Sequence, residues 1–177
     1  TYYKWENKKI NVSPIVLVHG FSVPSYIWRP TFEILAKKGH FVISLDLYGR
    51  GFSENVDDHY TDELFANQVI DLIEKLNINN VKLVGLSNGG RVISKIANLR
   101  PELVEKLIYV ASSAFKSTKP QSYNSVSQIE VDDFIKKQYP IISKGQLEDF
   151  KYPEKHIGWE KKYEELLKYK GFARALI

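Results

Sequence analysis

One serine carries the strongest chemical signal in this sequence. The stretch GLSNG at residues 85–89 fits the pattern G-x-S-x-G and is followed by Gly90. A serine at a tight turn from a strand into a helix is a typical carbonyl-attacking nucleophile. Side chains at Gly85 or Gly89 would collide with neighbouring backbone, and the helix N-terminus would favour a developing oxyanion. The pattern therefore predicts Ser87 as a covalent nucleophile.

Other loops also join a strand to a helix through glycines. A dinucleotide-binding G-x-G-x-x-G loop would need glycine at position 87, where Ser87 stands. A phosphate-binding Walker loop needs Gly-Lys followed by Ser or Thr, and the sequence has no such tripeptide. A structural turn of small residues is the simplest alternative. We expect no cofactor and no metal ion.

A second candidate loop is His19-Gly20-Phe21, which directly follows the apolar run of residues 15–18. Glycine after a buried strand lets the backbone turn sharply and present N–H groups at the same end of the sheet as Ser87. We interpret His19 as a structural residue that holds this loop, and not as a general base.

Alternating strands and helices must position both loops. The apolar patterns predict strands at residues 15–18, 41–47, 81–86 and 107–111, an edge strand within 2–10, and helices at 31–38, 61–76, 88–100, 126–139 and 159–169. No strand is evident after residue 111. Strands and helices in this order predict an α/β fold with a mostly parallel sheet flanked by helices.

Charge and composition exclude several classes of function. The net charge of +4 divides into +1 for residues 1–114 and +3 for residues 115–177, and lysines alternate with acids, so a nucleic-acid partner is not expected. The sequence has no cysteine, which excludes thiol chemistry. No apolar run is long enough to span a membrane, and residues 1–10 do not read as a signal peptide, so the expected location is the cytoplasm.

Five separated segments occur in an order that resembles the α/β-hydrolase superfamily, in particular its lid-bearing esterases and lipases. They are VHGF at 18–21, Trp28, DLYGRGFS at 46–53, the 85–90 turn and RPE at 100–102. The resemblance covers residues 14 to about 112. It implies that residues 1–114 form the N-terminal part of an α/β-hydrolase core, residues 115–170 a helical lid, and residues 171–177 the start of the return to the core.

The same resemblance assigns roles to individual residues. It implies that Ser87 is the nucleophile and that the backbone N–H groups of Phe21 and Asn88 form the oxyanion hole. It takes Asp46 and Arg50 as structural residues that brace the loop after the second strand. The other residues that it implicates are structural (Gly85, Gly89, Gly90, His19 and Gly20) or walls of a pocket (Trp28, Tyr48 and Trp159).

The catalytic acid and histidine are not identified in this sequence. In the family both follow the nucleophile, yet only His156 does so here, and it lies inside the expected lid. Ser112 and Ser113 occupy the position where some members carry the acid. A complete core needs roughly 240 residues before a lid is added. We therefore expect the last strands, with acid and base, to lie outside these 177 residues.

Three functions are consistent with these residues. The leading prediction is a serine hydrolase that cleaves a small-molecule carboxylic ester, thioester or lactone through an acyl-enzyme on Ser87. Hydroxynitrile lyases and peroxidases of the superfamily also keep this serine, whereas its epoxide hydrolases and haloalkane dehalogenases use Asp there. The alternative from another class is a non-catalytic small-molecule-binding or receptor-like protein.

Overall fold

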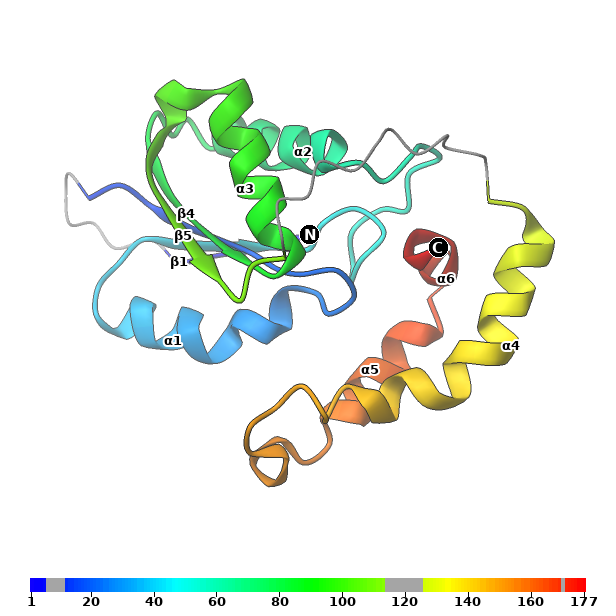
Figure 1. Ribbon diagram of the computed structural model, residues 1–177. Coiled ribbons are helices and arrows are strands. Elements are labelled where there is room, and N and C mark those ends of the chain that lie inside the picture. The colour runs from blue at the N-terminus through cyan, green and yellow to red at the C-terminus, as the bar shows by residue number, and fades with distance from the viewer. Residues whose placement is uncertain (6–11, 114–125, 170) are drawn as a thin grey trace. The chain divides into compact units, whose positions relative to one another are not determined.

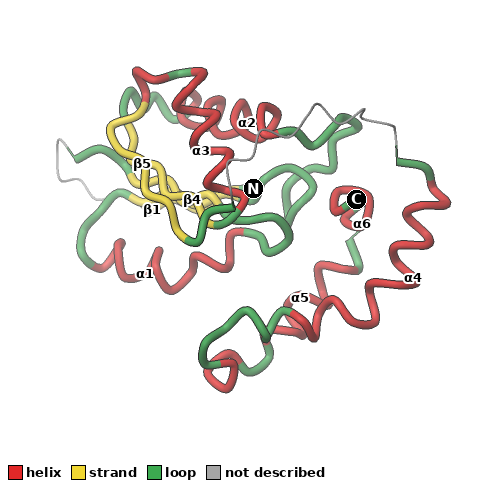
Figure 2. The backbone as a smooth tube through the Cα atoms, viewed as in Figure 1, coloured by secondary structure: helices red, strands yellow, loops and turns green. Residues whose placement is uncertain are grey.

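The chain divides into two units, residues 1–121 and 122–177 (Figure 1). The computed structural model describes residues 1–5, 12–113, 126–169 and 171–177. The boundary expected after residue 114 falls outside the described residues. Within the described part, every strand lies in the first unit (Figure 2).

The first unit is built on a five-stranded sheet with the order β1-β3-β2-β4-β5. Its strands are β1 (Tyr2–Trp5), β2 (Ile15–Val18), β3 (Val42–Leu45), β4 (Val81–Leu86) and β5 (Val104–Val110). β1 is antiparallel to β3, and all other neighbours are parallel. The predicted α/β class with a mostly parallel sheet is confirmed.

Helices cover both faces of this sheet. They are α1 (Arg29–Lys37), α2 (Asp62–Lys75) and α3 (Asn88–Leu99), with short 3-10 helices at Ser25–Trp28 and Pro101–Leu103. Figure 1 shows α1 on one face and α2 and α3 on the other. The predicted N-cap of α2 is confirmed, because the Thr61 hydroxyl accepts a hydrogen bond from the Leu64 N–H at 3.1 Å.

Strands β2, β3 and β4 are buried on both faces, which explains why they are continuous apolar runs instead of alternating ones, whereas β1 and most of β5 are exposed. Val16 and Val18 of β2 belong to the core cluster shared with α2 and α3. Leu17, between them, belongs to a second cluster that packs against Phe32 and Leu35 of α1. Alternate residues of β2 therefore pack against opposite helix layers, which fixes the register of this strand in the sheet.

That register brings the two candidate loops together. Val18, the last residue of β2, pairs with Gly85 of β4 and with Leu45 of β3. Gly20 and Ser87 each follow two residues later, so they emerge side by side at the carboxyl edge of the sheet. This is the edge where open α/β sheets bind ligands.

The second unit is helical in its described part. It contains α4 (Gln128–Gly145), a 3-10 helix at Pro153–His156, α5 (Trp159–Leu167) and α6 (Phe172–Leu176). α6 packs against α4 and α5, so residues 171–177 belong to this unit. Among the described residues, no helix is long and apolar enough to cross a membrane.

Helix α4 corrects one prediction, because it continues through Pro140 whereas the expected helix ended at Tyr139. A proline inside a helix removes one backbone hydrogen bond. Ser143, one turn later, is buried and donates to Glu164 of α5 at 3.3 Å. This tertiary contact helps to hold the turn beyond the proline, and the local sequence pattern does not contain it.

Candidate active site

Ser87 occupies a strained turn between β4 and α3. Its backbone has φ 51° and ψ −117°, in the region that favours glycine. Such a conformation costs about 1–3 kcal/mol and persists only where neighbours enforce it. Here the Ser87 N–H donates to the Val110 carbonyl at 3.0 Å, and the Ser87 carbonyl accepts from the N–H groups of Gly90 (3.0 Å) and Ser113 (3.2 Å). The end of β5 thus fixes the strained turn.

The glycines of the turn are required by space. A Cβ on Gly85 would lie 2.5 Å from the Gly89 carbonyl oxygen. A Cβ on Gly89 would lie 2.4 Å from the Val18 carbonyl oxygen and 2.5 Å from that of His19. These contacts are with backbone atoms, which cannot rotate away. The prediction that side chains would collide at both positions is confirmed.

The loop His19-Gly20-Phe21 lies directly beside the serine. A Cβ on Gly20 would be 3.2 Å from the Ser87 Cβ. Among the described residues, the Phe21 N–H makes no hydrogen bond. Asn88 is the first residue of α3, and the first N–H groups of a helix have no partner within it. The backbone N–H groups of Phe21 and Asn88 therefore belong to the two segments that meet at the serine.

His19 connects this loop to the chain after β3. Its Nε2 accepts from the Leu47 N–H at 2.9 Å, and its Nδ1 lies 2.8 Å from the Gly20 carbonyl oxygen. The neutral ring must therefore carry its proton on Nδ1 and donate it to Gly20. Complete burial lowers the pKa of His19 from 6.5 to about 4, against the opposing effects of the Gly20 hydrogen bond and of Asp46. The neutral ring therefore joins the loop after β2 to the loop after β3 by hydrogen bonds.

Arg50 and Asp46 are buried near the His19 ring, with exposures of 3% and 2%. The Asp46 carboxylate accepts from the N–H groups of Ser25 (2.8 Å) and Phe52 (3.1 Å). The Arg50 Nε donates to the Phe21 carbonyl at 2.6 Å. Asp46 braces the loop after β3, and Arg50 also reaches the loop after β2.

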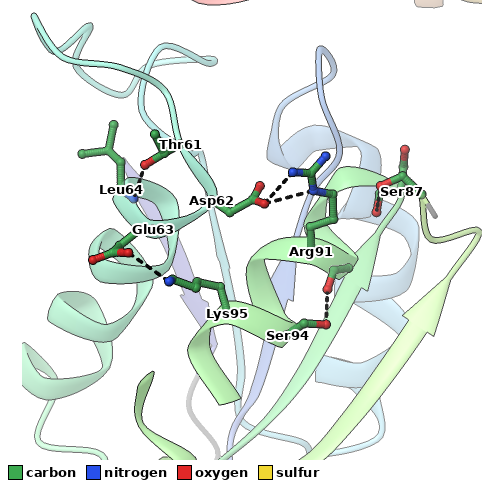
Figure 3. A network of polar contacts seen from close by, with 10 residues as sticks. Thr61, Asp62, Glu63, Leu64, Ser87, Arg91, Ser94 and Lys95 are labelled. Atoms are coloured by element: carbon green, nitrogen blue, oxygen red, sulfur yellow. Dashed lines mark hydrogen bonds and ion pairs between the residues drawn. The ribbon is translucent and has the colours of Figure 1, made fainter. Parts of the chain in front are cut away.

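The helix that begins at the serine is tied to its neighbour by ion pairs, which Figure 3 shows together. Arg91 of α3 donates to one oxygen of Asp62 through Nε (3.0 Å) and Nη2 (2.7 Å). One turn further along, Lys95 pairs with Glu63 at 2.9 Å. Both acids lie in the first turn of α2, so these pairs align the N-terminal ends of α2 and α3 at the carboxyl edge of the sheet.

The three residues expected to line a pocket have different surroundings. Trp28 is buried, at 6% exposure, in the core cluster under α1. Tyr48 is half-buried against the cluster under α2 and α3, and its N–H donates to Gln68 at 2.8 Å. Trp159 lies in the second unit, where it contacts Phe150 edge to face at 5.0 Å between ring centroids.

Within residues 1–5 and 12–113 of the first unit, the Ser87 hydroxyl makes no hydrogen bond, and no acid or base contacts it. The Ser112 and Ser113 hydroxyls contact the Ser87 carbonyl instead, at 3.5 and 3.4 Å. His156 lies in the second unit, where its ring stacks on Phe150 at 3.8 Å.

Sequence reasoning missed two of these contacts. It placed Arg50 only at the loop after β3, and it did not identify the Asp62–Arg91 pair. The partners are 29 residues apart in both cases. The one available signal was the position of Asp62 directly after the cap Thr61, which puts a carboxylate at the edge of the sheet that Ser87 occupies.

Comparisons with known proteins agree with this architecture. The sequence profile described as alpha/beta hydrolase fold matches residues 13–176. Over 105 residues the chain is 33% identical to (E)-2-((N-methylformamido)methylene)succinate hydrolase of Acinetobacter baylyi, a match that covers 59% of this chain and 39% of that protein. The chain thus spans less than half the length of this relative.

Solved structures show the same fold. Cfl2 of Burkholderia cenocepacia superposes with a TM-score of 0.83 at 20% identity, over 99% of this chain and 64% of that one. The enol-lactonase of Burkholderia xenovorans LB400 superposes with a TM-score of 0.77 at 20% identity, over 100% of this chain and 69% of that one. At such identities the likeness concerns the fold alone.

Proposed function

Because this chain belongs to the alpha/beta hydrolase fold family, we propose that the protein is a serine hydrolase that cleaves a carboxylic ester, thioester or lactone through Ser87. One observation carries the proposal: a serine held at φ 51° stands at the start of α3 and directly beside Gly20 of the loop after β2, where a Cβ on Gly20 would be 3.2 Å from the Ser87 Cβ. A structural turn has no need of a strained serine at the meeting point of a glycine loop and a helix N-terminus. The hydrolase name of the 33% identical relative supports the same class.

The chemistry follows from this arrangement. The Ser87 oxygen attacks the carbonyl carbon, and the carbonyl oxygen becomes an oxyanion that accepts hydrogen bonds from Phe21 and Asn88. Each such donor contributes about 3 kcal/mol to the transition state. The alcohol or thiol leaves, an acyl-enzyme remains, and water then releases the acid. Proton transfer from Ser87 needs a histidine oriented by a carboxylate, and the described residues do not identify that pair.

The small-molecule substrate would bind at the carboxyl edge of the sheet. We propose residues 1–114 as the N-terminal part of the hydrolase core and residues 115–170 as a helical lid. Tyr48 of the first unit and Trp159 of the second unit are each proposed as residues that help to select the acyl and alcohol groups. Trp28, which is buried under α1, would support the loop after β2 from behind.

The test is turnover of a short p-nitrophenyl ester by the full-length protein and by Ser87→Ala. Ser94→Ala is the matched control, because it removes a hydroxyl from the same helix and Ser94 lies outside the proposed machinery. We expect Ser87→Ala to lose at least about 10³-fold in kcat, with Ser94→Ala close to wild type. No turnover above the Ser87→Ala level would overturn the proposal and favour a binding protein on the same fold.

A further inference from the structure

The buried Arg50 reaches across to the loop that carries one of the proposed oxyanion donors. Its Nε donates to the Phe21 carbonyl at 2.6 Å. The guanidinium also lies over the Phe21 ring, 5.3 Å from its centroid, and within 6.0 Å of the Tyr60 and Phe65 ring centroids. A single side chain therefore holds both the backbone and the ring of Phe21.

The peptide that carries the Phe21 N–H is fixed from its other end. Its carbonyl, that of Gly20, lies 2.8 Å from the protonated Nδ1 of His19. Because a trans peptide is planar, its N–H points opposite to its carbonyl, away from His19. Arg50 holds the next carbonyl, so both peptides around Phe21 are fixed. The N–H that they orient makes no hydrogen bond among the described residues.

The surroundings of position 50 suit an arginine better than a lysine. Its planar group can donate through Nε while stacking on rings, which a lysine ammonium cannot do. The carboxylate of the neighbouring Asp46 accepts from two backbone N–H groups, at Ser25 and Phe52. Asp46 thus shapes the loop after β3 and leaves the Arg50 Nε directed at Phe21.

We propose that Arg50 is a positioning residue that pre-orders the oxyanion loop, so that the Phe21 N–H meets the developing negative charge without reorganisation. This inference rests on the proposed function. It assigns Arg50 a role in the turnover step, whereas the sequence reading gave it only the loop after β3. Donors fixed in advance lower the barrier because no energy is spent on orienting them during the reaction.

The substitution Arg50→Met keeps a long unbranched side chain and removes the hydrogen bond and the charge. We expect kcat to fall about 100-fold, as for a misplaced catalytic group, while KM changes less than about threefold because ground-state binding does not need the oxyanion donor. Arg50→Lys keeps the charge without the Nε–H and the planar stack, and we expect an intermediate loss of kcat, about tenfold.

Two further readouts separate positioning from general stability. A boronic acid inhibitor forms a tetrahedral adduct on the nucleophile, so its affinity should fall in proportion to kcat/KM across the variants. Hydrogen exchange of the segment 19–23 should become faster in Arg50→Met. Ile73→Val is the matched control, because it trims a buried side chain of α2 away from the loop and should leave both readouts unchanged.

The outcomes distinguish this inference from the proposed function. A folded Arg50→Met or Arg50→Lys variant with kcat within threefold of wild type would overturn the role of Arg50. If wild type shows no turnover above Ser87→Ala, the proposed function fails, and the exchange measurement still tests whether Arg50 holds the loop. Unchanged exchange of residues 19–23 in Arg50→Met would then overturn the role of Arg50. If Arg50→Met does not fold, the same criteria apply to Arg50→Lys.

Discussion

Acidification should lower the free energy of unfolding of this protein, and His19 is the cause. The folded state keeps this ring neutral, with its pKa lowered from 6.5 to about 4 by burial, whereas the unfolded chain protonates it near 6.5. Between these values the unfolded state binds more protons, so the free energy of unfolding falls as pH drops. Protonation would also end the hydrogen bond that Nε2 accepts from the Leu47 N–H.

The size of the effect follows from the two pKa values. The difference between the two pKa values is about 2.5, and at about 1.4 kcal/mol for each pKa unit it gives about 3.5 kcal/mol over the whole range. Above pH 7 the neutral His19 contributes this amount in full to the free energy of unfolding. About 2 kcal/mol of it is lost when the pH falls to 5. Against a typical total of about 5–15 kcal/mol, such a loss is readily measured.

The assay is urea unfolding at pH 7, 6 and 5, followed by tryptophan fluorescence, for wild type and His19→Gln. The variant is less stable at every pH, but its stability should decline by about 2 kcal/mol less than that of wild type between pH 7 and 5. All other ionisable groups are the same in both proteins, so their contributions cancel in the comparison. Equal declines in the two proteins would refute the reasoning that His19 is held neutral.

Three further substitutions test other parts of the structure. Gly89→Ala would place a Cβ against backbone oxygens at 2.4 and 2.5 Å, and we expect more than about 3 kcal/mol of destabilisation by thermal unfolding; an unchanged Tm would contradict the packing. Asp62→Asn weakens the partly exposed pair with Arg91 and should cost about 0.5–1 kcal/mol, with the cost absent when Arg91 is already Met. Ser127→Ala removes the capping box of α4 and should cost about 1 kcal/mol, visible as faster hydrogen exchange at residues 128–131; unaltered exchange would argue against the cap.

The sequence predicted the parts of this fold that depend on local pattern. Four of the strands, three helices of the first unit and the cap at Thr61 follow from apolar runs, spacing and a hydroxyl at the right place. The turn at Ser87 follows from glycines whose absence of side chains is a steric requirement. These features need no knowledge of distant residues.

What the sequence could not predict depends on contacts between distant residues. The bonds of His19 to Leu47 and of Arg50 to Phe21 exist because the register of β2 and β3 aligns the ends of these strands. The continuation of α4 past Pro140 involves a contact with α5. Neither the partner nor the distance is encoded in a short window, so local reasoning placed these residues without their contacts.

The central claim is that Ser87 is a nucleophile, and covalent labelling tests it most directly. The full-length protein would be treated with a fluorophosphonate and the modified peptide identified by mass spectrometry. We predict a single adduct on Ser87, none in Ser87→Ala, and slower labelling in Arg50→Met. An adduct at another residue, or equal labelling of wild type and Ser87→Ala, would contradict the account.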